Sequence, residues 1–186
     1  MAQPPMPDRL RVRVGTNPGR AVPGMIAGPV GRRGERERGN MNAVTKALAA
    51  GAAGASTTTL LHELTRRLTP AAPRVDLLGM QALVRLLRAG GTAPPTGDAL
   101  YYWTLAGDLA SNSAYFGTVG AGSRERAMAL GGALGLVAGA GAVLLPPALG
   151  LSGATTGRTG ATAALTVALY TAGGLVAGAV YRALPG

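Results

Sequence analysis

The chain has 186 residues and a mean hydropathy of +0.24, with 47% apolar and only 14% charged residues. Soluble domains carry about 25% charged residues, and a chain with one Phe and one Trp would bury little side-chain area in a soluble core. The formal net charge is +10, but the basic residues gather in the first forty positions and beside apolar segments, as membrane flanks do. There is no Cys and only one His, which leaves no thiolate or histidine metal site. We therefore expect an integral membrane protein whose partner is the lipid bilayer, with no nucleic acid, metal or cofactor.

Residues 1–40 are rich in Arg, Pro and Gly and show no lasting hydrophobic period, so this segment is predicted to be a disordered basic tail. Two alternatives stay open. The tail could be a cytosolic topology anchor. Alternatively, the native chain could begin at Met41, where MNAVTKALAAG resembles the start of a first membrane helix.

The domain at 41–184 is predicted to be an all-α polytopic bundle with spans at about 43–64, 99–119, 127–149 and 160–181. No charged side chain occurs from 127 to 157 or from 159 to 181, and uncharged runs of this length are typical of membrane spans. The first span ends in an interfacial group made of His62, Glu63 and Arg67. Because Arg66 and Arg67 follow Glu63 at i+3 and i+4, a salt bridge is favoured over a proton-handling role for the carboxylate.

A short helix at about 76–89 is predicted between the first two spans, and it is too short to cross a bilayer. Gln81, Arg85 and Arg88 share one side while leucines gather on another, a pattern typical of a helix lying on a membrane surface. The alternative is a helix packed across the mouth of the bundle. Asp76 is expected to cap this helix and Asp98 the one that follows.

The helix at 99–119 carries a polar stripe along an otherwise apolar span. At 100° per residue, these side chains share one face: Tyr101, Thr104, Asp108, Ser111, Asn112 and Tyr115. An acid within a span costs about 2.5–3.5 kcal/mol, so Asp108 needs compensation, which Ser111 and Asn112 are placed to provide. The favoured interpretation is polar glue between helices, and the alternative is a site that binds and releases a proton or cation.

The last two spans carry glycines at every fourth position. Gly131, Gly135 and Gly139 form one row and Gly174 and Gly178 another, and such rows allow helices to approach closely in lipid. We expect these rows to be packing faces, with a homo-oligomer as one possible product, and we expect Pro146 and Pro147 to end the third span. No nucleophile, phosphate loop or metal spacing links the polar residues, so an enzyme is not expected.

The stretches APRVDLLGMQAL, LAGDLASNSAYF and TVALYTAGGLVAG resemble a group of small multi-pass integral membrane proteins from bacteria. In that group an acid-bearing, LAGDL-type helix lies among glycine-rich spans. The resemblance covers residues 41–184 and implies location in the bacterial inner (cytoplasmic) membrane, but it brings no activity with it. The function favoured at this stage is a structural or accessory role in the membrane. The alternative is a proton- or cation-linked transporter or channel subunit that uses Asp108.

Overall fold

The structure is a computed structural model that describes residues 41–185, and the predicted tail at 1–40 lies outside the described residues. All regular elements in the described part are helical, which confirms the predicted all-α class. The α-helices are α2 (Ala43–Leu68), α3 (Val75–Ala89), α4 (Gly97–Gly117), α5 (Ala127–Ala148), α6 (Ala154–Gly157) and α7 (Gly160–Ala183). Two 3-10 helices, η1 (Thr118–Ala121) and η2 (Arg124–Arg126), connect α4 to α5.

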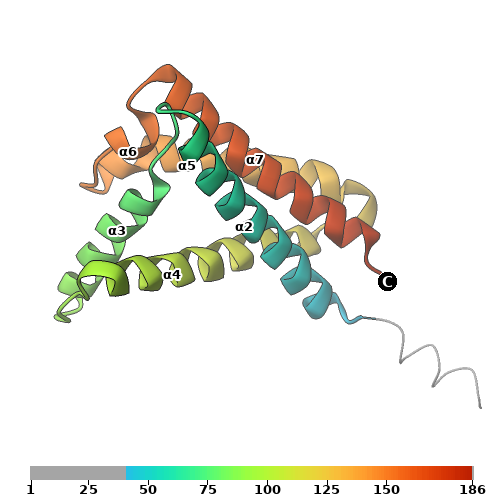
Figure 1. Cartoon of the computed structure of the whole chain (residues 1–186). Coiled ribbons are helices and arrows are strands. Elements are labelled where there is room, and N and C mark those ends of the chain that lie inside the picture. Colours follow the sequence, from blue (N-terminus) through green and yellow to red (C-terminus); the bar gives the residue numbers. More distant parts are fainter. Residues whose placement is uncertain (1–40, 186) are drawn as a thin grey trace, which may run out of the picture. The chain divides into compact units, whose positions relative to one another are not determined.

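Helix α7 lies at the centre of the packing, with α5 along one side and α2 along another (Figure 1). Helix α2 also packs against α4, and α3 packs against α4. In Figure 1, α2, α3 and α4 enclose a triangle, with α4 and α2 diverging from their crossing and α3 between their far ends.

The two glycine rows pack against each other within the chain. A Cβ added at Gly131 would overlap the carbonyl oxygen of Gly174, and one at Gly178 would overlap that of Ala127. Gly135 likewise lies directly against the backbone of Tyr170. Backbone approach of this kind is what glycine rows permit. Because each row is already covered by the other, a homo-oligomer would have to use another face.

Helix α2 also uses small residues to meet two neighbours. Gly51 lies against the backbone of Ser113 on α4, and Gly54 lies against Gly173 and Ala177 on α7. Glycine on adjacent faces therefore lets α2 fit between α4 and α7.

Helix α3 is tied to the connection between α5 and α7. The side-chain oxygen of Gln81 accepts a hydrogen bond from the Ser152 amide at 2.9 Å, and Arg85 donates to the Gly150 carbonyl at 3.3 Å. These bonds place α3 across one end of the bundle, as in the second of the two predicted arrangements, and its Leu86 remains exposed.

The capping predictions were wrong. The N-cap residues of α3 and α4 are Arg74 and Thr96, and neither forms a side-chain capping bond. Asp76 and Asp98 lie inside the first turns instead, where a negative charge still favours the helix dipole. The Asp76 carboxylate forms ion pairs with the side chains of Arg66 and Arg74.

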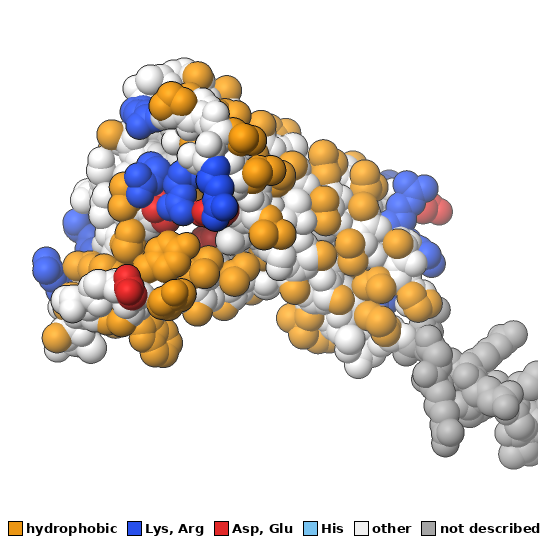
Figure 2. All heavy atoms as spheres, viewed as in Figure 1, with side chains coloured by type: hydrophobic (Ala, Val, Ile, Leu, Met, Phe, Trp, Pro, Cys, Tyr) orange, Lys and Arg blue, Asp and Glu red, His pale blue; other side chains and the backbone are white. Residues whose placement is uncertain are grey.

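Two segments of the described chain are long and apolar enough to cross a membrane, Arg124–Ala148 and Gly160–Ala183. Only 17% of the apolar window of the first and 28% of that of the second are buried. The core helix of a soluble protein would be mostly buried, whereas these two present large side chains outward, such as Leu144, which is 72% exposed. On the face of the molecule drawn in Figure 2, hydrophobic side chains are exposed over much of the surface. Helices α2 and α4 are long enough to span but do not reach the same apolarity.

Candidate functional site

Asp108 occupies an unusual position among the charged residues that the structure describes. Several Asp, Glu, Lys and Arg residues within 41–185 belong to the long helices α2, α4, α5 and α7. Among these, Asp108 alone lies more than about two turns from both ends of its helix. The remaining charges of the described chain lie near helix ends, in α3 or in connections. A single carboxylate is therefore isolated within the bundle.

The hydrogen bonds of Asp108 are local to α4. Its Oδ1 atom accepts from the side-chain amide of Asn112 at 3.0 Å, whereas the Ser111 hydroxyl donates to the backbone carbonyl of Asp108 at 3.1 Å. Of the two donors suggested by the sequence, only Asn112 therefore reaches the carboxylate. Within residues 41–185, no hydrogen bond or ion pair joins the carboxylate to another helix. The carboxylate itself therefore supplies no interhelical hydrogen bond of the kind expected of polar glue.

Two cavities meet the side chain of Asp108. The first, here called the α2–α4 cavity, has a volume of about 370 Å³ and lies among α2, α4 and the start of α3. The second, the α4–α5 cavity, has a volume of about 660 Å³ and lies among α3, α4, α5 and α7. Both volumes fall in the range of small-molecule sites. Asp108 lines both cavities.

The predicted polar stripe is divided between these cavities. Tyr101 and Thr104 line the α2–α4 cavity, while Ser111, Asn112 and Tyr115 line the α4–α5 cavity. Sequence periodicity placed these residues on one face of α4, but it gave no sign that two separate spaces adjoin that face.

Two hydroxyls of the stripe are already occupied. The Thr104 hydroxyl donates to the Leu100 carbonyl within α4 at 2.8 Å, and the Tyr115 hydroxyl donates to the Leu134 carbonyl of α5 at 3.0 Å. Tyr115 therefore joins two helices, and neither hydroxyl is a free donor toward its cavity.

His62 lies in the wall of the α2–α4 cavity with its side chain buried, at 6% exposure. Its ring meets that of Tyr170 edge to face, with centroids 5.4 Å apart. Neither imidazole nitrogen has a hydrogen-bond partner among the described residues, and neither has the Thr59 hydroxyl. His62 therefore differs from Glu63 and Arg67, with which the sequence analysis grouped it, because it faces into the bundle. Its spacing of four residues from the buried Thr58 was a signal for this orientation.

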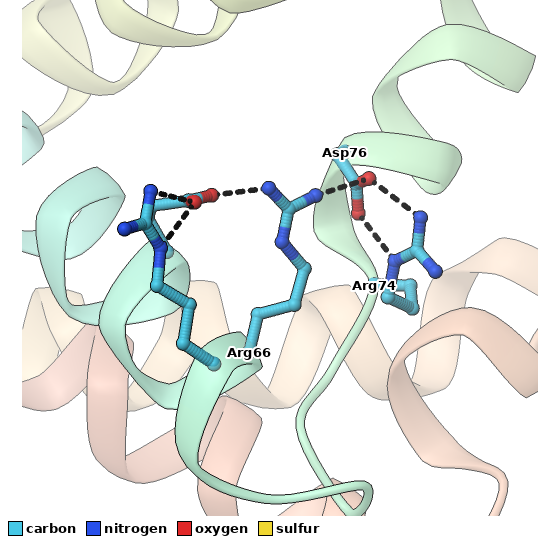
Figure 3. Close-up of polar contacts among 5 residues, drawn as sticks. Arg66, Arg74 and Asp76 are labelled. Atoms are coloured by element: carbon cyan, nitrogen blue, oxygen red, sulfur yellow. Dashed lines mark hydrogen bonds and ion pairs between the residues drawn. The ribbon is translucent and has the colours of Figure 1, made fainter.

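Glu63 and Arg67 belong to a chain of alternating charges at the end of α2 (Figure 3). Arg67 and Arg66 both pair with Glu63; Arg66 also donates to Asp76 at 3.0 Å, and Arg74 donates to Asp76 at 2.9 Å. The sequence spacing indicated the pairs on α2, but the pair between Arg66 and Asp76 joins α2 to α3 across a turn and has no helical spacing. In Figure 2, basic side chains gather beside acidic ones, next to hydrophobic side chains.

Asp76 is the least exposed carboxylate of this ion-pair chain, with a side chain that is 18% exposed. Burial acts to raise the pKa of Asp76, but the hydrogen bond and charge of Arg74, a backbone amide and the charge of Arg66 outweigh it and hold this pKa below its usual value. The same contact raises the pKa of Arg74, because its hydrogen bond to Asp76 outweighs burial. Asp76 and Arg74 therefore remain ionised at neutral pH, and Asp76 with its partner Arg66 forms one wall of the α2–α4 cavity.

No protein-family profile, curated protein or solved structure matches this chain. The function of the site must therefore be inferred from its own chemistry.

Proposed function

We propose that this protein is a proton- or cation-linked transporter or channel subunit of a membrane, in which Asp108 is the exchanging group. The observation that carries the proposal is the position of Asp108 in the walls of both cavities. One carboxylate oxygen is held by Asn112 and the other has no partner among the described residues. A free carboxylate oxygen beside open space is suited to binding a proton or a cation.

The cost of this arrangement supports a functional role. Placing a charged side chain inside a membrane costs on the order of 2.5–3.5 kcal/mol. Such a side chain is usually paired with an opposite charge or has a function in transport or proton transfer. Asp108 has no basic partner, since none of the described salt bridges includes it. An Asn or Ser at this position would serve local packing at lower cost.

In the proposed protein four helices cross the membrane: the two apolar helices α5 and α7, and also α2 and α4. Both helices exceed the length that a bilayer requires, at about 1.5 Å per residue. Large apolar side chains are exposed on α2, including Leu48 and Leu64. Near the start of α4, Tyr102 and Trp103 are 65% and 67% exposed, as expected for aromatic residues at the headgroup level. The proposed location is the bacterial inner membrane.

The α2–α4 cavity would be the route between the charged end of the bundle and Asp108. Its wall contains Glu63, Arg66 and Asp76 at one end and Asp108 further along. The α4–α5 cavity runs from Asp108 along α5, past Val137 and Leu145, toward the same end of the bundle, where α3 lines both cavities. The two cavities would therefore give ions access to Asp108 from one side of the membrane.

The test is ion flux in proteoliposomes that contain the purified chain. Proton and K⁺ fluxes would be measured for the unmodified protein, for Asp108→Asn and for the matched control Asp98→Asn. Asp98 lies on the same helix but is exposed at its start.

We expect flux in the unmodified protein and in the Asp98→Asn variant, and loss of flux in the Asp108→Asn variant at unchanged yield and oligomeric size. No flux in any of the proteins, or equal flux in all three, would reject the proposal. The structural or accessory role in the membrane would then be the better interpretation.

A further inference from the structure

We infer that the cavities at Asp108 bind an amphipathic organic cation, namely a protonated amine attached to an apolar body. The inference rests on the proposed function in one respect: it takes Asp108 as the group that exchanges ions. It goes further by naming the chemical class of the substrate.

The number of available ligands argues against a metal ion as the substrate. Ca²⁺ takes six to eight oxygen ligands and Mg²⁺ requires an octahedral set. The described residues contain no group of three His, Asp or Glu side chains that could hold a metal. Asp108 offers one free carboxylate oxygen, which is enough for an ammonium group but not for a dehydrated metal ion.

The walls of both cavities suit an apolar body. Around Asp108, the α2–α4 cavity is lined by Leu60, Val75 and Leu105. The α4–α5 cavity is lined by Leu78, Val137 and Leu145. Apolar surface that leaves water for such a wall is stabilised in proportion to the area buried. A hydrated inorganic ion gains nothing from these side chains, whereas the hydrocarbon part of an amine does.

Aromatic rings add a second attraction for positive charge. Tyr101 lines the first cavity, and Tyr115 and Tyr170 line the second. A cation over the face of such a ring is attracted by the negative charge of the ring face, and more strongly when water is excluded. Tyrosines therefore adjoin Asp108 from both cavities.

The charge balance of the walls points the same way. The α2–α4 cavity is lined by the carboxylates of Glu63, Asp76 and Asp108 and by the guanidinium groups of Arg66 and Arg67. Both arginines are paired with Glu63 or Asp76, and Arg74 pairs with Asp76 from outside the lining. In the α4–α5 cavity, Asp108 is the only charged residue of the lining. Because Glu63, Asp76 and Asp108 are matched in number by the three arginines, the preference for a cation over an anion comes from the local charge of Asp108, which lines both cavities.

The experiment measures binding directly, with 2-phenylethylammonium as the probe and 2-phenylethanol as its uncharged analogue of similar size. Equilibrium dialysis would be carried out with the full chain in detergent micelles, with empty micelles as the blank. We expect the ammonium to bind the unmodified chain at least about tenfold more tightly than the alcohol, because only the ammonium pairs with a carboxylate in a partly desolvated site. This comparison requires no variant, so it is independent of any folding defect.

Two variants then locate the site. Asp108→Asn should reduce binding of the ammonium to the level of the alcohol, while Asp98→Asn should leave both affinities unchanged. Equal binding of ammonium and alcohol by the unmodified chain would overturn the inference, and so would undiminished binding of the ammonium by a folded Asp108→Asn variant.

The outcomes separate this inference from the proposed function. Proton or K⁺ flux that depends on Asp108, without binding of the ammonium, would reject the organic cation and leave the proposed function in place. Binding of the ammonium that depends on Asp108, without flux of protons, K⁺ or the ammonium itself, would support the binding site and reject transport.

Discussion

The side-chain hydroxyl of Thr156 donates a hydrogen bond to the carbonyl oxygen of Ala142, 2.6 Å away. Within a regular α-helix this carbonyl would accept from the amide of residue 146, but Pro146 has no N–H to donate. Thr156 lies in α6, beyond the end of α5, and its side chain is fully buried. The turn after α5 therefore supplies the bond that proline removes, and α5 continues through both prolines to Ala148 rather than ending before them.

Thr156→Val should destabilise the protein because it leaves the Ala142 carbonyl without this partner at nearly unchanged side-chain volume. An unsatisfied buried acceptor costs about 1–3 kcal/mol, and we expect a decrease in the free energy of unfolding in that range. Denaturation in detergent micelles, followed by circular dichroism, would measure it.

Thr57→Val is the matched control for this change. The Thr57 hydroxyl bonds to the Ala53 carbonyl within α2, where a backbone amide is also available to that carbonyl. Its replacement should change the free energy of unfolding by less than about 0.5 kcal/mol. Equal losses for the two variants would show that the bond from Thr156 has no special role.

Gly135→Ala should separate α5 from α7. A Cβ at this position would overlap the Tyr170 carbonyl and come close to the Cα atom of Thr171, so backbone rather than a flexible side chain would have to move. Overpacking of this kind costs about 1–3 kcal/mol. A lower thermal unfolding midpoint in micelles is the expected result.

Gly141→Ala provides the comparison on the same helix, because its Cβ would meet only the Leu145 side chain, at 3.5 Å. We expect no loss of stability there. If Gly135→Ala left the unfolding midpoint unchanged while Gly141→Ala lowered it, the packing of the two glycine rows would be refuted.

Local sequence pattern was enough to predict the main helices, because apolar runs and breaks at Gly or Pro are local features. The predicted boundaries of the helix at 127–149 differ by only one residue from α5. The glycine rows were also visible from their spacing. Their mutual packing was not, because a GxxxG row indicates that a helix can approach another closely but does not name the partner.

The site was predictable only in part for the same reason. The isolated position of Asp108 could be read from the sequence, and its bond to Asn112 follows from the i+4 spacing. The two cavities lie between α4 and its neighbours, α2 and α3 for one and α3, α5 and α7 for the other, and such spaces are a property of tertiary packing. The contact between Arg66 and Asp76 likewise requires the turn between α2 and α3 to bring them together.

Stability should depend on pH through Asp76. Because the pKa of this carboxyl is held below its usual value in the folded protein, its contribution is present above the unfolded pKa of about 3.9 and is lost as pH falls through the folded pKa. We expect Asp76→Asn to lower the free energy of unfolding by about 1 kcal/mol at pH 7, with this difference closing below about pH 4. Thermal unfolding of both proteins across this pH range is the measurement.

Arg67→Gln is the control for the ion-pair chain, because the Arg67 side chain is 74% exposed and pairs only with Glu63. Exposed pairs contribute little, so its effect should be near zero at every pH. A gap between Asp76→Asn and the unmodified protein that widened as the pH fell would contradict the assigned role of Asp76.

The number of spans can be decided by single-cysteine labelling, since the chain contains no cysteine of its own. Thr92, Ser123 and Ser152 are exposed residues in the connections after α3, α4 and α5. If α2, α4, α5 and α7 all cross the membrane, Thr92→Cys and Ser152→Cys lie on one side and Ser123→Cys on the other. If only α5 and α7 cross, Thr92→Cys and Ser123→Cys share a side and Ser152→Cys is opposite. Labelling of intact and permeabilised cells with a membrane-impermeant maleimide separates the two patterns. We expect the first, because α2 packs against the candidate span α7 and α4 packs against α2.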